Sequence, residues 1–236
     1  KIEQAFLTAT EDYATDRRGD IGLFVRLASL ECYRHVWEAI ISSNQSSSSS
    51  FTGAHLARYV CACLKQTMEK IDRVRTVSTK QLHLLVENSL VDKETGSLSS
   101  KSVVDRLFSG VSSQQNQSTL ISDFSQLVKT FHALDSAHDF AAPSAAFDLV
   151  VPNLISLPTF CESIVDGLGA SAGCLTPHVA QSALEALSKA VSTSTSTSSP
   201  SSTMIATAIK NCFNKYQKSE RMCVSVLLMA DRCLER

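Results

Sequence analysis

The stretch of sequence that decides the fold is Asp12-Tyr13-Ala14-Thr15-Asp16-Arg17-Arg18-Gly19-Asp20-Ile21-Gly22-Leu23-Phe24-Val25-Arg26. Its first half is polar, and its second half opens a long run of apolar residues at helical spacing. Asp20 is placed to cap a helix, because Asp side chains accept hydrogen bonds from the N–H groups of a first helical turn. We therefore expect a helix from Ile21 to Ile41, entered through a turn that Gly19 and Gly22 permit.

This helix carries two apolar stripes. The first contains Ile21, Val25, Ala28, Cys32, Val36 and Ala39, and the second contains Leu23, Leu27, Leu30, Trp37 and Ile41. A helix with two apolar faces is expected to lie between neighbouring helices, as in proteins built from stacked helix pairs. We therefore expect Val25 to lie in the core and Arg26 to belong to a ladder of charges between stacked repeats.

A second segment repeats the same pattern. Glu69 stands before Val74 and Arg75 much as Asp20 stands before Val25 and Arg26. The surrounding residues 52–91 read as two helices joined by a turn, a unit of about forty residues, which is the length of a HEAT repeat. No segment shows the alternation and turn residues of a strand hairpin. The sequence predicts an all-α fold without a β-sheet: a HEAT/armadillo-like α-solenoid of stacked antiparallel helix pairs.

The expected organisation has three parts. Residues 1–91 form HEAT-like helix pairs, residues 92–142 form an irregular segment with short helices near 102–108 and 120–134, and residues 143–236 form further pairs. A helix is expected to begin at Thr176-Pro177, because Pro is favoured at the first helical position. Two serine-rich tracts, 46–50 and 192–203, carry almost no apolar side chains and are expected to be loops.

Composition limits the classes of function. The net charge of the 236 residues is −1 with acids and bases interspersed, so we expect no nucleic-acid partner. No uncharged apolar run is long enough for a membrane span. Most of the eight cysteines fall within helical apolar patterns, which indicates reduced thiols rather than a disulfide framework. The chain opens at Lys1 without an initiator Met or a signal peptide, so we expect a piece of a longer protein.

The motifs that carry chemistry are weak. Gly167, Gly169 and Gly173 resemble the glycines of a dinucleotide-binding loop. They follow a helical pattern rather than a strand, however, so we interpret them as small residues for close helix packing and as a helix stop. Cys61 and Cys63 have no second ligand pair at metal-binding spacing. There is no phosphate-binding P-loop, and no catalytic triad can be assembled. We expect no catalytic residue, no metal site and no cofactor, and therefore a protein that is not an enzyme.

Four segments, in order, resemble one family. The opening stretch is similar to the Asp-Tyr-(Thr)-Thr-Asp-(Ser)-Arg-Gly-Asp-Val-Gly-(aromatic)-Val-Arg segment of the tubulin-folding cofactor D family, and residues 69–75 are similar to its Glu-Lys-Ile-Asp-Arg-(Phe)-Arg. Residues 154–176 resemble its Leu-Leu-Gly-Leu-Pro-Thr-Tyr … Gly-Gly-Leu-Thr segment. Residues 219–234 resemble its Glu-Arg-Val-Ser-Val helix. The resemblance points to the C-terminal HEAT-like region of these large chaperones.

The resemblance implies a function in protein binding. It suggests a cytoplasmic, cytoskeleton-associated protein that binds β-tubulin and assists assembly and disassembly of the αβ-tubulin heterodimer. The implied partners are tubulin cofactors E and C and an Arl-type small GTPase, and together they would stimulate GTP hydrolysis by tubulin. The alternative is a generic α-solenoid adaptor with another client.

Two sets of residues follow from this interpretation. Tyr13, Asp16, Arg17 and Arg18 precede the helix and are not needed to form it, so we expect them to contact a partner. A structural role is expected for Asp20, Gly22, Val25, Arg26, Glu69, Val74 and Arg75.

Overall fold

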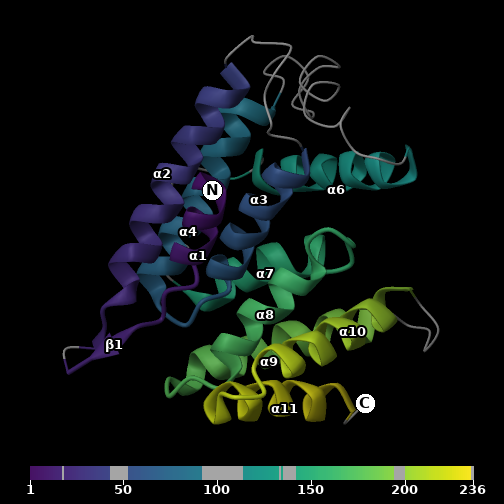
Figure 1. Cartoon of the computed structure of the whole chain (residues 1–236). Helices are drawn as coiled ribbons and strands as arrows, with labels where there is room; N and C mark the ends of the chain where they lie inside the picture. The colour runs from purple at the N-terminus through teal and green to yellow at the C-terminus, as the bar shows by residue number, and fades with distance from the viewer. Residues whose placement is uncertain are drawn as a thin grey trace. The chain divides into compact units, whose positions relative to one another are not determined.

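Helices account for most of the described chain (Figure 1). The computed structural model describes residues 1–17, 19–42, 53–91, 114–132, 134, 142–193 and 200–234. Its helices are α1 (Ile2–Ala9), α2 (Gly22–Ser42), α3 (Gly53–Thr67), α4 (Asp72–Leu85), the π-helical turn η1 (Val86–Leu90), α6 (Gln114–His132), α7 (Pro143–Leu154), α8 (Cys161–Ala172), α9 (Pro177–Thr193), α10 (Pro200–Lys215) and α11 (Glu220–Leu234). Neighbouring helices in the chain pack against each other in several pairs, as α1 does on α2, α8 on α9 and α10 on α11, which confirms the all-α class built from helix pairs.

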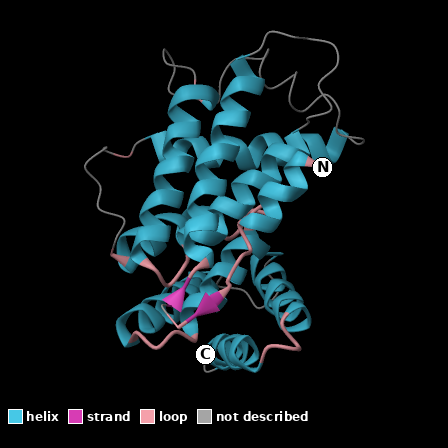
Figure 2. Cartoon of the chain, turned by 60° about the vertical axis from the view of Figure 1, so that its left-hand side comes forward, coloured by secondary structure: helices cyan, strands magenta, loops and turns pink. Residues whose placement is uncertain are grey.

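One short β-ribbon departs from the expectation of no sheet (Figure 2). Strands β1 (Thr15–Asp16) and β2 (Gly19–Asp20) pair antiparallel, with Thr15 opposite Asp20 and Asp16 opposite Gly19. Gly19 has φ +115°, a conformation that residues with a Cβ rarely adopt. The hairpin was not predicted because two-residue strands are too short to show alternation.

The chain divides into two compact units. Unit 1 comprises residues 1–63 and 77–137, and unit 2 comprises residues 64–76 and 138–236. The boundaries therefore fall within α3 and α4. The segment 92–142, expected to be separate, contributes the long helix α6 to unit 1.

Unit 1 is organised around an aromatic cluster. The ring of Tyr33 stacks on that of Phe6 in α1 at 4.9 Å and meets that of Tyr59 in α3 at 4.7 Å. The Tyr59 hydroxyl donates a hydrogen bond to the carbonyl of Leu30 at 3.1 Å. Trp37 is fully buried one turn further along α2. These contacts bury one face of α2 against α1 and α3.

The other face of α2 is exposed, which corrects the expectation for Val25. The buried face contains Leu27, Leu30, Tyr33 and Trp37 together with Arg26 and Arg34. This spacing of three and four residues places the first predicted stripe on the opposite side, since a helix turns once every 3.6 residues. Val25 is 43% exposed and Phe24 is 63% exposed. The prediction that Val25 lies in the core was therefore wrong, and Arg26 is the buried residue of the pair.

Unit 2 packs around α8, which contacts α9, α10 and α11. Small residues on α8 allow neighbouring segments of the chain to approach its backbone closely. A Cβ added to Gly167 would lie 2.4 Å from the backbone oxygen of Lys65, and one added to Gly173 would lie 1.6 Å from the Ser225 hydroxyl oxygen. α8 ends at Ala172 with Gly173 as its C-cap. The glycine run thus lies within and at the end of a helix, as predicted, and serves close packing.

Several boundaries differ from those expected. α6 extends over residues 114–132, so the segment 92–142 holds a long helix rather than only short ones. α9 and α10 include residues 192–193 and 200–203 of the predicted loop, because Ser side chains can bond within a helix, as Ser192 Oγ does to the Ser188 carbonyl at 2.8 Å. Residues 46–50, 102–108 and 194–199 lie outside the described residues.

The packing of α8 gives a prediction with an internal control. Gly167→Ala should lower the free energy of unfolding by about 2 kcal/mol, since the added methyl group meets backbone atoms that cannot move independently. Gly169→Ala should be neutral or stabilising by up to about 1 kcal/mol, because alanine favours helix and the tightest contact of the added Cβ, at 3.0 Å, is with the flexible end of Met229, while Val226 lies at an ordinary contact distance of 3.9 Å. Urea unfolding of both variants measures the difference. Equal effects at the two positions would contradict the packing of α8.

Candidate functional site

A buried arginine connects the hairpin to the first turns of α2. Arg26 has a side chain that is 0% exposed, and its guanidinium binds the Asp20 carboxylate at two points, 2.9 Å from Nη2 to Oδ2 and 3.2 Å from Nη1 to Oδ1. Arg26 Nη1 also donates to the backbone carbonyl of Asp12. The Tyr13 ring lies over the guanidinium at 4.4 Å, a distance typical of cation–π contacts. We call these four residues the arginine clamp.

The backbone around the clamp is closely fitted. A Cβ added to Gly22 would lie 2.2 Å from the Asp12 carbonyl oxygen, so only glycine fits there. The N–H groups of Ile21 and Gly22 both donate to the Ala14 carbonyl at 3.0 Å. Asp20 Oδ1 accepts from the Leu23 N–H at 3.0 Å, which is the predicted helix cap. The carboxylate of Asp20 therefore caps α2 and pairs with Arg26 at once.

The structure separates the residues that were expected to contact a partner. Tyr13 is partly buried and belongs to the clamp, so it has a structural contact. Arg17 is exposed beside β1. Asp16 is described only in its backbone, as part of β1, and Arg18 lies outside the described residues. Among these four, the described side chain that faces solvent is that of Arg17.

The second copy of the motif also holds a buried arginine. Arg75 is 2% exposed and donates through Nη1 to the backbone carbonyl of Glu69 at 2.7 Å. Burial lowers the pKa of Arg75, while the carboxylates of Asp72 and Glu69 oppose this shift. Val74 is fully buried, in contrast to Val25. The two motifs therefore share an arginine bonded to the backbone ahead of its helix, and they differ in the valine.

A buried charge cluster in unit 2 was not anticipated from the sequence. The Asp166 carboxylate lies 3.1 Å from Lys65 Nζ and 2.7 Å from Lys215 Nζ, and it accepts a hydrogen bond of 2.6 Å from the Tyr216 hydroxyl. The side chains of Asp166 and Lys65 are 7% and 4% exposed. Burial alone would raise the pKa of Asp166, but the two lysines and the hydrogen bonds from Lys215 and Tyr216 outweigh it and lower that pKa.

A signal for this cluster was present in the sequence. Lys65 and Asp166 each interrupt an apolar helical pattern, and a charged residue on an apolar face needs an opposite charge. Nothing in the sequence showed that these two residues, which are distant in the chain, would pair.

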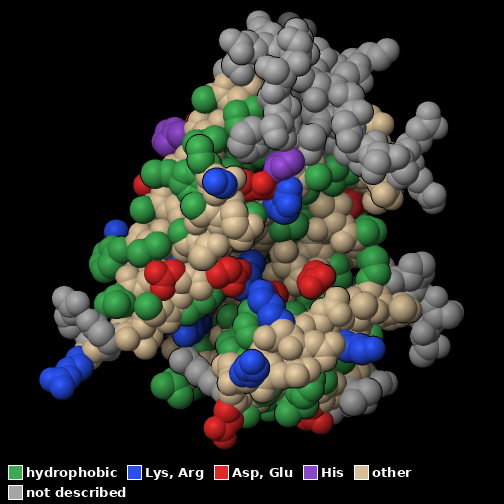
Figure 3. Space-filling view, in the orientation of Figure 1, with side chains coloured by type: hydrophobic (Ala, Val, Ile, Leu, Met, Phe, Trp, Pro, Cys, Tyr) green, Lys and Arg blue, Asp and Glu red, His purple; other side chains and the backbone are tan. Residues whose placement is uncertain are grey.

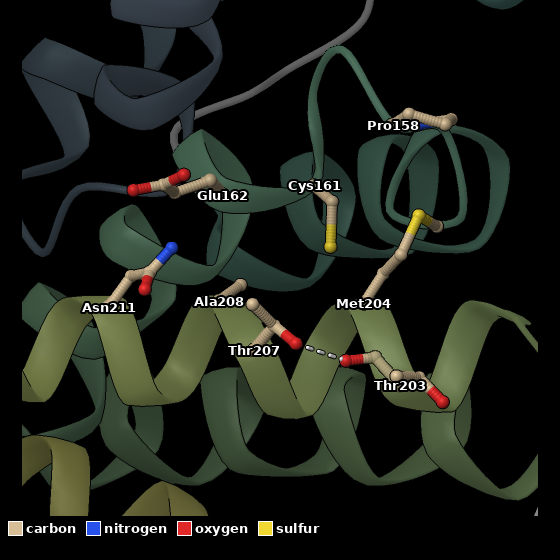
Figure 4. A pocket seen from close by; sticks show the side chains of 8 residues that line it. All are labelled: Pro158, Cys161, Glu162, Thr203, Met204, Thr207, Ala208 and Asn211. Carbon is tan, nitrogen blue, oxygen red and sulfur yellow. Dashed lines mark hydrogen bonds between the residues drawn. The ribbon is translucent and has the colours of Figure 1, made fainter.

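A small pocket lies between the start of α8 and α10 (Figure 4). Its volume is about 210 Å³, and Cys161, Met204 and Ala208 supply apolar walls beside Glu162 and Asn211. Burial, with a smaller contribution from Glu162, raises the pKa of the Cys161 thiol to about 11. This thiol is protonated at neutral pH and is a poor nucleophile. The eight cysteines are free thiols in the structure.

Comparison with known families decides the assignment. Residues 57–236 match the family described as "Tubulin folding cofactor D C terminal". The chain belongs to this family. A curated relative, Tubulin-specific chaperone D of Dictyostelium discoideum, is 32% identical over 104 residues, which cover 37% of this chain and 7% of that protein. No solved structure matches the chain.

The family match covers the two units unequally. It begins at residue 57, so it includes Arg75 and the Asp166 cluster and leaves out the arginine clamp and the hairpin. The aligned region is a small fraction of the curated relative. In the part of the chain that the structure describes, no helix has the length and hydropathy needed to cross a membrane.

The clamp predicts unequal effects at adjacent positions. Arg26→Ala should lower the free energy of unfolding by about 3 kcal/mol or more, because it removes a buried partner of Asp20 and leaves the Asp12 carbonyl without its donor. Val25→Asp should change it by only about 0.5 kcal/mol, as is usual for exposed positions. Thermal and urea unfolding of the two variants test this order. A larger loss for Val25→Asp would show that the α2 register is different.

The Asp166 cluster predicts a pH dependence. A carboxyl whose pKa is lowered on folding adds stability that is complete above its unfolded pKa, near the usual 3.8, and is lost as the pH falls through the folded value. Asp166→Asn should therefore lower stability at pH 7 by about 3 kcal/mol, since Lys65 loses its buried partner. The gap between parent and variant should narrow below about pH 4. Urea midpoints between pH 3 and 7 provide the measurement, and a gap that does not change with pH would contradict it.

Proposed function

We propose that this chain binds tubulin as part of a tubulin-folding cofactor and contributes to assembly and disassembly of the αβ-tubulin heterodimer. Its direct target is β-tubulin. Tubulin cofactors E and C and an Arl-type small GTPase are its further partners, and the assembly stimulates GTP hydrolysis by tubulin without a catalytic residue from this chain. The protein acts in the cytoplasm at the microtubule cytoskeleton.

The observation that carries this proposal is the family match over residues 57–236. The relative is a tubulin-specific chaperone by name, which supports tubulin as the client. The physical features agree with a binding protein, since packed helix pairs present broad surfaces on which another protein can dock. The pocket beside Cys161 is small, and its thiol is protonated at neutral pH. A role in protein binding therefore explains more of the molecule than a catalytic role does.

Within this function, the hairpin turn is the contact we propose for unit 1. Arg17 is exposed beside a ribbon whose second strand is tied to α2 by the contact between Asp20 and Arg26. Arginine is over-represented among the interface residues that contribute most of the binding free energy. A side chain presented on a rigid ribbon loses less conformational entropy on binding than one on a mobile loop. Asp16 and Arg18, its neighbours in sequence, are included in the proposed contact, while Tyr13 supports it through the clamp.

Capture of purified αβ-tubulin by the immobilised chain tests the function directly. We expect the parent to bind tubulin, and Arg17→Glu to weaken binding about tenfold or more, because truncating an interface arginine commonly costs 1–2 kcal/mol and reversal adds repulsion. Lys218→Glu, at another exposed basic residue, is the matched control and should leave binding unchanged. Both variants should keep the parent's melting temperature.

Two other results have defined meanings. Absence of tubulin binding by the parent, with capture of another client, would favour the generic adaptor. Tubulin binding that is equal for Arg17→Glu and the parent would remove the hairpin from the interface and leave the function intact. Addition of the Arl-type GTPase and cofactors E and C to the same assay tests the further partners.

A further inference from the structure

The exposed face of α2 is apolar, and its residues follow helical spacing. Ile21 is 40% exposed, Phe24 63% and Val25 43%, and Ala28 and Cys32 continue the same side of the helix. We call these five residues the α2 stripe. From Ile21 to Cys32 the stripe is about 16 Å long, at 1.5 Å per helical residue. Figure 3 shows hydrophobic side chains along the edge of the molecule that α2 forms.

The shape of the stripe limits what can bind it. The backbone N–H and C=O groups along a helix are bonded within the helix, so a strand cannot add to it by backbone pairing. The side of a single helix is convex, whereas small molecules bind in concave pockets. Side chains at positions i, i+3, i+4 and i+7 form the ridge that packs into the groove of a second helix. The occupant that fits the α2 stripe is therefore the apolar side of another helix.

Charges at the two ends of the stripe give the occupant a direction. Arg17 is exposed beside the ribbon that leads into α2, and Glu31 is exposed near the far end of the stripe. A helix laid along the stripe is favoured when it carries a carboxylate near Arg17 and a basic residue near Glu31. In Figure 3 a Lys or Arg side chain projects at the hairpin end of this edge.

We propose that the α2 stripe is the docking surface for an amphipathic helix of the tubulin client, with its acidic end at the hairpin and its basic end at Glu31. This inference rests on the proposed function, since it names the surface by which the chain holds tubulin. The arginine clamp fixes the hairpin to the first turns of α2, so Arg17 and the stripe form one preformed surface. A preformed surface binds with a smaller entropic loss.

The test measures the affinity of the full 236-residue chain for purified αβ-tubulin. Val25→Asp places a charge in the centre of the stripe and should weaken binding about tenfold or more. Leu228→Asp on α11 is the matched control, because Leu228 is also 43% exposed, and it should leave the affinity within about twofold of the parent. Val25→Ser serves as a second variant in case Val25→Asp lowers the melting temperature.

Glu31→Lys tests the direction of the occupant. It should weaken binding at low salt, and the loss should shrink at high salt, since the Debye length falls from about 10 Å at 0.1 M to about 3 Å at 1 M. Tighter binding by Glu31→Lys would overturn the proposed direction.

Each remaining outcome separates the inference from the function on which it rests. If the parent binds tubulin and Val25→Asp binds equally well, the stripe is not the docking surface and the proposed function stands. Equal losses for Val25→Asp and Leu228→Asp would also overturn the stripe, because the effect would not be specific to α2. If the parent does not bind tubulin, both proposals fall. If the chain alone sediments as a dimer that Val25→Asp dissociates, the occupant is a second copy and the inference is overturned.

Discussion

The pairing of the buried Arg26 with the partly exposed Asp20 is the constraint on which the arrangement of α2 depends. A guanidinium removed from water is unstable unless charge and hydrogen bonds compensate it, and Asp20, the Asp12 carbonyl and the Tyr13 ring supply them. These partners lie on the chain before the helix. Burial of Arg26 therefore requires the segment from Asp12 to Asp20 to fold back against α2, and the hairpin is the consequence.

The same pair sets the rotation of α2 about its axis. With Arg26 directed inward, positions 27, 30, 33 and 37 follow it into the core of unit 1, and positions 25, 28 and 32 face outward. An apolar side chain at position 25 is then exposed although the next residue, Arg26, is fully buried. The exposure of the α2 stripe is thus a result of where the charged residue lies, and the stripe meets solvent along the first half of the helix.

Sequence reasoning found the helices because their apolar periodicity is strong, and it found the cap at Asp20 because capping is local. It failed at Val25, since two apolar stripes on one helix do not show which stripe is buried; that choice was made by the pairing of Arg26 with Asp20. It failed again at Asp166, whose partner Lys65 is far away in the sequence. The hairpin was missed because two residue pairs carry no periodic signal. In each case the missing information was a contact between residues that no local pattern connects.

The two copies of the motif, at Asp20–Arg26 and at Glu69–Arg75, use a buried arginine in two different structural settings. Arg26 and Arg75 are both buried and both donate to a backbone carbonyl ahead of their helices. Arg75 bonds the carbonyl of Glu69, six positions before it, and needs only the turn between α3 and α4. Arg26 reaches Asp12, fourteen positions before it, so the intervening residues must form a structure of their own. In the second copy the valine is buried and the arginine completes a turn, as expected of a purely structural motif. In the first copy the longer span creates a ribbon with an exposed Arg17, and the valine faces solvent. A purely structural motif would require neither the ribbon with its exposed Arg17 nor a solvent-facing valine. We therefore place the binding surface at the first copy.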